Sequence, residues 1–156
     1  MRNATLLLVL VCVSTEVACS FSTDFVVVNA SDYPAVVLYK IGETGIEPLR
    51  VTRTPATLDS SQMRSRDWKE LSSSEYLFDL EKRTVTVSIM PGKSLRINQG
   101  GEWRERETPA NFIIKEIEIR GTNGEITLKG DQVYKSFVPE SKPFFGPPTV
   151  VILTYK

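Results

Sequence analysis

Residues 83–97 read RTVTVSIMPGKSLRI, and this stretch decides the expected fold. Apolar and polar side chains alternate over residues 84–89, as they do in a β-strand that buries one face. The dipeptide Pro91-Gly92 then turns the chain, since both residues favour tight turns. Leu95 and Ile97 carry the next apolar face. The stretch therefore predicts a half-buried strand, a short turn and a second strand.

The same pattern continues on both sides of this stretch. Short apolar or alternating runs recur about every ten residues, and no strand–helix–strand rhythm separates them. The further predicted strands cover residues 24–29, 35–41, 76–81, 112–120, 125–129, 132–138 and 149–155. This organisation predicts an all-β fold, namely an antiparallel β-sandwich of the immunoglobulin-like or a related Greek-key type, with a small β-barrel as the alternative.

Three local details of this fold can be predicted. Residues 24–29 form a continuous apolar run that suits a strand buried on both faces, and we expect a hairpin with residues 35–41. A second hairpin is expected between residues 112–120 and 125–129, because two glycines flank its turn. The one predicted helix covers Asp67–Leu71, where Asp67 and Glu70 have the spacing of a capping box.

Composition excludes several classes of function. The chain has 156 residues, 19 Lys and Arg against 19 Asp and Glu, and no histidine. Zero net charge argues against a nucleic-acid partner. Without histidine there is no Ser-His-Asp triad and no imidazole ligand for a metal ion, so we expect no metal and no cofactor. Residues 21–156 are predicted to form one domain, whose oligomeric state stays open.

The first twenty residues have the composition of an export signal. Arg2 precedes an apolar run over residues 6–13, and small residues follow before Phe21. This order predicts a signal peptide over residues 1–20, and hence a secreted, periplasmic or membrane-anchored protein. Residues 17–19 also resemble the end of a bacterial lipoprotein signal, although Glu16 departs from that pattern. The resemblance implies lipidation of Cys19, which is the only membrane attachment that the sequence indicates.

Paired carboxylates are the one catalytic arrangement to consider. Glu116 and Glu118 lie two residues apart in a predicted strand. Their spacing of about 6.5–7 Å suits the two acids of an inverting glycosidase. Because Ile117 and Ile119 supply the opposite, core-facing side, a solvated surface is the simpler interpretation of the two glutamates. We therefore expect no enzyme, and keep a carbohydrate-active hydrolase as the alternative.

Binding is the function that the sequence favours. Phe144 and Phe145 are adjacent in a proline-rich loop, residues 139–148, and the loops of a rigid sandwich often carry binding residues. Trp68 and Trp103 are weaker candidates, each beside charged residues. For Trp68 we expect packing at one end of the sandwich.

We therefore expect an exported, non-catalytic protein that binds a protein or a glycan through strand edges or this loop. The alternative is a membrane-tethered lipoprotein with the same domain. Asn29-Ala30-Ser31 also fits the sequon for N-glycosylation.

Overall fold

The computed structural model describes residues 22–42, 55–62, 67–100, 103–105, 108, 112–141 and 150–156. These residues form strands, one 3-10 helix η1 (Ser60–Gln62) and one short helix α2 (Asp131–Lys135). The strands of the first sheet, sheet A, are β1 (Asp24–Asn29), β3 (Ala56–Asp59), β4 (Lys69–Glu70), β7 (Lys93–Gln99), β10 (Val138–Pro139) and β11 (Val150–Tyr155). The strands of the second sheet, sheet B, are β2 (Ala35–Ile41), β5 (Tyr76–Asp79), β6 (Thr84–Ile89), β8 (Ile114–Gly121) and β9 (Gly124–Lys129).

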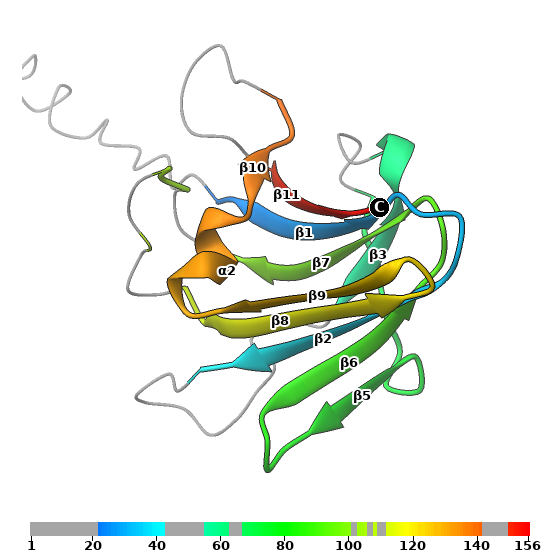
Figure 1. Ribbon diagram of the computed structural model, residues 1–156, viewed down its shortest axis with the longest axis horizontal. Coiled ribbons are helices and arrows are strands. Elements are labelled where there is room, and N and C mark those ends of the chain that lie inside the picture. Colours follow the sequence, from blue (N-terminus) through cyan, green and yellow to red (C-terminus); the bar gives the residue numbers. More distant parts are fainter. Residues whose placement is uncertain are drawn as a thin grey trace, which may run out of the picture.

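The two sheets pack face to face around one hydrophobic core (Figure 1). Sheet A has the order β10-β11-β1-β7-β3-β4, and sheet B has the order β5-β6-β2-β8-β9. The predicted all-β sandwich is confirmed, and the barrel alternative is wrong because the sheets do not close on one another.

Strand β1 occupies the middle of sheet A and is buried on both faces, as its apolar run predicts. It pairs in parallel with β11 and antiparallel with β7. Phe25 and Val27 face the core between the sheets, whereas Val26 and Val28 face outward and pack against a separate apolar cluster. Valine fits this position because a β-branched side chain packs well on a pleated surface.

The predicted hairpin of β1 with β2 is wrong. Strand β1 belongs to sheet A and β2 to sheet B, so residues 30–34 cross from one sheet to the other. The burial patterns give the reason: β1 is buried along its whole length, while β2 alternates between buried and less buried positions. A strand buried on both faces and a strand with one open face belong to different sheets here. The turn residues between them suit a hairpin as well as a crossing between the sheets.

Sheet B follows the sequence pattern closely. Strand β6 buries Val85, Val87 and Ile89, the three residues that its alternation places on one face. The predicted hairpin of β8 with β9 is confirmed, and Gly124 closes it with a φ of 127°. Because φ in this range disfavours side chains, glycine suits the position.

Two predicted elements near the ends of sheet A are wrong. The segment predicted as the helix Asp67–Leu71 contains β4, which pairs with β3, and Leu71 donates its N–H to the carbonyl of Pro55 at 2.8 Å. One turn of isolated helix is costly to nucleate, so pairing with an existing strand prevails. Residues 132–138 do not form a strand of their own: they include most of α2 and only the first residue of β10. Val133 and Phe137 bury one face with helical spacing.

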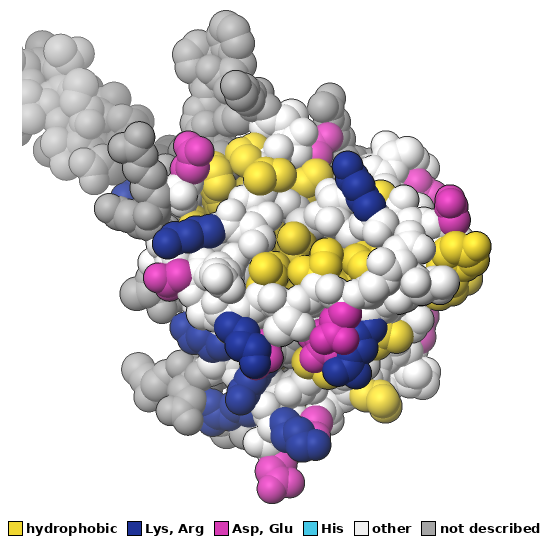
Figure 2. Space-filling view, in the orientation of Figure 1, with side chains coloured by type: hydrophobic (Ala, Val, Ile, Leu, Met, Phe, Trp, Pro, Cys, Tyr) yellow, Lys and Arg dark blue, Asp and Glu magenta, His cyan; other side chains and the backbone are white. Residues whose placement is uncertain are grey.

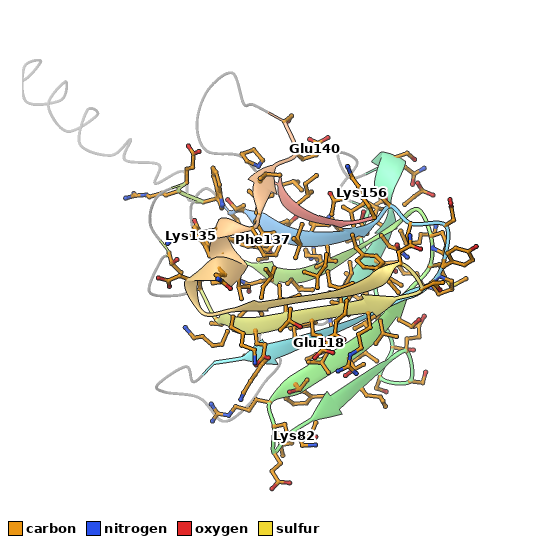
Figure 3. The ribbon with its side chains drawn as sticks, in the orientation of Figure 1. Lys82, Glu118, Lys135, Phe137, Glu140 and Lys156 are labelled. Atoms are coloured by element: carbon orange, nitrogen blue, oxygen red, sulfur yellow. The ribbon has the colours of Figure 1, made fainter. Side chains whose placement is uncertain are left out.

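An aromatic cluster fills the core beside α2. Phe25 is its centre, and its ring centroid lies 5.0 Å from Phe112, 5.4 Å from Phe137 and 5.8 Å from Tyr134. Figure 1 places α2 between the two sheets at one end of the sandwich, and Figure 3 shows Phe137 directed into the molecule. Tilted and edge-on contacts of this kind add to the stabilisation that burial itself supplies.

Candidate binding site

The two glutamates considered for catalysis lie on the outer face of sheet B, each beside a cation. The Glu116 Oε1 lies 2.9 Å from Lys129 Nζ on the neighbouring strand, and the hydrogen bond from Lys129 to this carboxylate raises the pKa of the lysine. Glu118 contacts the Nε of Arg120. Ile117 is buried on the opposite face, as predicted. Glu116 and Lys129 form a cross-strand ion pair of the kind that stabilises an exposed sheet surface, whereas Glu118 and Arg120 lie on the same strand.

Trp68 lies on the outer face of sheet A, not at an end of the sandwich as predicted. It packs against Val26 and Val28, and the guanidinium carbon of Arg96 lies 5.1 Å from its ring centroid. Arg96 is itself buried, with its Nη1 3.9 Å from the Asp24 carboxylate. A cation over an indole face is a favourable contact, more so when water is excluded. The stacked arginine and the valines give Trp68 a packing role in this layer.

Trp103 belongs to the aromatic cluster. Its ring stacks on Tyr134 with centroids 6.5 Å apart, and its backbone N–H donates to Thr23 Oγ1 at 3.2 Å. The hydroxyl of Tyr134 accepts a hydrogen bond from the N–H of Arg104 at 2.7 Å. Trp103 is half-buried in this position and packs against the core.

The other predicted candidates lie outside the described residues. They are Phe144 and Phe145 in the proline-rich loop, Cys19, and the whole segment 1–20. Within the described part of the chain, no helix is long and apolar enough to cross a membrane. The same residues contain no cluster of acidic, cysteine or histidine side chains suited to a metal ion.

Asn29 has a structural role that the sequon does not reveal. Its side chain is fully buried, and its Nδ2 donates to the carbonyls of Tyr33 at 2.9 Å and Ile89 at 3.1 Å. Its Oδ1 accepts hydrogen bonds from the N–H and the hydroxyl of Ser31, at 3.1 and 2.7 Å. Because the amide nitrogen uses both protons inside the fold, a glycan on Asn29 is incompatible with this structure.

An open groove with a volume of about 480 Å³ lies on sheet B. It lies where β2 ends, beside the turn between β5 and β6 and the beginning of β8. Among the residues that the structure describes, its charged lining residues are Lys40, Lys82, Arg83 and Lys115 together with Glu81 and Glu116. Figure 2 shows Lys and Arg side chains gathered over this part of the molecule, where the ends of β2 and β8 lie. The groove thus combines four cations with two carboxylates.

This groove is a feature that the sequence does not reveal. Its residues come from three segments that are far apart in the chain, and the pairing of β2 with both β6 and β8 brings them together. The sequence holds one indication of the irregular backbone beside the groove. Ile114, Ile117 and Ile119 are spaced by three and then two residues, which interrupts the alternation in β8.

Comparison with protein-family models, with curated proteins and with solved structures finds no match.

Proposed function

We propose that this protein is an exported, non-catalytic β-sandwich that binds its ligand at the cell envelope or outside the cell. The groove at the end of β2 carries the proposal, because four cations line it and its carboxylate Glu116 is already held by Lys129. A groove of this volume lies within the range of small-molecule sites. Export is supported by the signal-like composition of residues 1–20.

The sheet gives this groove a rigid frame. Lys40 is paired in register with Thr84 on one side and Glu116 on the other, so the three side chains project from adjacent strands. Charges held on paired strands lose little freedom when a ligand arrives, which favours binding by a preformed surface. Strand edges remain a second means of binding, with β9 longer than the two-residue edge strands β4 and β10.

A turnover assay tests the non-catalytic part of the proposal. The purified mature protein is incubated with a panel of glycan and ester substrates, alongside the variants Glu116→Gln and Glu118→Gln. We expect no turnover above a buffer blank, because Glu116 and Glu118 lie on the outer face of sheet B and each carboxylate contacts a cation. Turnover that either substitution abolishes would establish a carbohydrate-active or esterolytic enzyme and contradict the proposal.

A further inference from the structure

In the described part of the chain, β9 is the longest of the four strands that end a sheet. Sheet A ends at the two-residue strands β10 and β4, and sheet B ends at β5, with four residues, and at β9, with six. Strand β9 contains no proline and pairs with β8 in unbroken register. Helix α2 follows β9, packs between the sheets through Val133 and Tyr134, and adds no strand to this edge. Short strands, prolines and bulges protect sheet edges from pairing with another chain, and β9 has none of these features.

The turn between β8 and β9 determines which backbone groups point to the outside. Gly121 faces Gly124 across a turn of two residues, so these two residues exchange both of their hydrogen bonds. Hydrogen-bonded and non-bonded pairs alternate along an antiparallel ladder, so every second residue of β9 directs its N–H and C=O groups away from β8. These residues are Glu125, Thr127 and Lys129. Between described residues, no turn, loop or cap hydrogen bond uses their backbone groups.

The inner face of β9 is apolar and incompletely covered. Ile126 and Leu128 are half-buried and pack against the core. Figure 2 shows hydrophobic side chains in a row beside the place where Figure 1 draws β9. A further strand on this edge would therefore cover apolar surface as well as pair with backbone groups.

The outer face of β9 carries two charges that end two rows of paired residues. Lys40 is paired in register with Glu116, and Glu116 with Lys129, whose Nζ lies 2.9 Å from that carboxylate. Glu125 is paired with Arg120, and the Glu125 Oε2 lies 3.7 Å from the Arg120 Nε. At the edge of the sheet, one row therefore ends in a cation and the other in an anion.

We propose that β9 pairs antiparallel with β9 of a second copy of this chain, about a two-fold axis at Thr127. In this register Glu125 faces Lys129 of the second copy, and Lys129 faces its Glu125. The row that ends in Lys129 then continues with Glu125 and Arg120 of the second copy, so the sign of the charge alternates across the interface. Opposite charges that face each other across strands stabilise a sheet, whereas like charges destabilise it.

The hydrogen-bonding pattern of β9 fits the same register. The residues that face each other on the outer side of the two strands are the ones whose N–H and C=O groups point away from β8. Three such pairs supply about six backbone hydrogen bonds, two at each pair. On the inner side, Ile126 faces Leu128 of the second copy, which continues the apolar face.

Other registers lose these features. A shift of two residues breaks both ion pairs, and a shift of four places Glu125 or Lys129 opposite its own copy. A shift of one residue places the inner side chains of one copy against the outer side chains of the other. Strand β9 thus has the self-complementarity that a two-fold interface requires. This inference goes beyond the ligand binding proposed above and does not depend on the groove.

Two charge reversals and their mixture test the proposal. Glu125→Lys places lysines opposite each other in the dimer, and Lys129→Glu places glutamates opposite each other. The purified mature protein is followed by sedimentation velocity over a series of concentrations. We expect the wild type to dimerise reversibly, and each variant alone to need about tenfold more protein to do so. An equimolar mixture of the two variants should restore dimerisation, because every lysine then faces a glutamate of the other copy.

A second set of variants tests the backbone contact. Thr127→Pro removes an N–H that points away from β8, so the ladder inside the domain is kept while the edge loses its central donor. Thr127→Val keeps this N–H and is the matched control. We expect Thr127→Pro to be monomeric and Thr127→Val to dimerise as the wild type does, each with a cooperative melting transition that shows a folded domain.

Three results would overturn the proposal. The first is a wild type that stays monomeric up to about 1 mM, a concentration at which even a small specific interface associates. The second is dimerisation that neither charge reversal weakens, which would place the interface on another surface. The third is a mixture of the two charge variants that stays monomeric although the wild type dimerises. None of these results bears on the groove or on export, which are tested by other measurements.

Discussion

Replacing Phe25 with alanine is expected to lower the free energy of unfolding by about 3–5 kcal/mol. Phe25 is 2% exposed and contacts Phe112, Tyr134 and Phe137, which come from opposite parts of the chain. Removing its ring leaves a cavity that these three rigid rings cannot fill. The folded protein therefore loses the free energy of burying the ring and also bears the cost of the cavity. Equilibrium unfolding in urea measures the loss.

A matched control separates this effect from loss of apolar surface alone. Leu77 in β5 is 74% exposed, so Leu77→Ala should change stability by no more than about 0.5 kcal/mol. If Phe25→Ala were as mild as Leu77→Ala, the aromatic cluster could not be the centre of the core. The loss expected for Phe25→Ala is a large part of the total stability of a domain, which is typically about 5–15 kcal/mol.

Replacing Asn29 with alanine is expected to cost about 2–4 kcal/mol. The substitution removes the donor for two carbonyls, of Tyr33 and Ile89, and the acceptor for Ser31. A buried polar group left without its partner costs more than an average hydrogen bond contributes. The side chain also ties the crossing between the sheets to the end of β6, because its Nδ2 donates to the carbonyls of both Tyr33 and Ile89.

Asn123 offers the matched control for this second substitution. It lies exposed in the turn between β8 and β9, so Asn123→Ala should unfold close to the wild-type urea midpoint. Equal midpoints for Asn29→Ala and the wild type would contradict the structural role of Asn29. Occupancy of the sequon in folded, secreted protein would contradict it as well, since the Asn29 amide would then carry a glycan in place of its two donated protons.

Strands with a strict pattern could be predicted from the sequence, but, apart from the hairpin of β8 with β9, their partners could not. The alternation in β6 and the apolar run in β1 define their buried faces directly, because side-chain direction in a strand has a period of two. The pairing of β1 with β11 joins the two ends of the domain in one parallel ladder. No local pattern encodes that contact, since it depends on which layer each strand finally joins.

The candidate site was harder to predict than the strands. The alternation in β8 correctly predicts that Glu116 and Glu118 lie on the outer face. It does not predict that Lys129 and Arg120 form ion pairs with them. The groove depends on a bulge and on the left-handed conformation of Arg83. Both are irregularities of the backbone that tertiary pairing imposes, and an arginine in a turn carries no sequence signal for a positive φ.

The most direct test of the exported binding function is the intact mass of the mature protein. The full chain is expressed in a secreting host and recovered from outside the cytosol. The proposal predicts a chain that starts at Phe21, or at an acylated Cys19 if the lipoprotein-like signal is used. The first result means release, and the second means a membrane tether. A chain that retains Met1 and residues 2–20 and stays in the cytosol would contradict the proposed function.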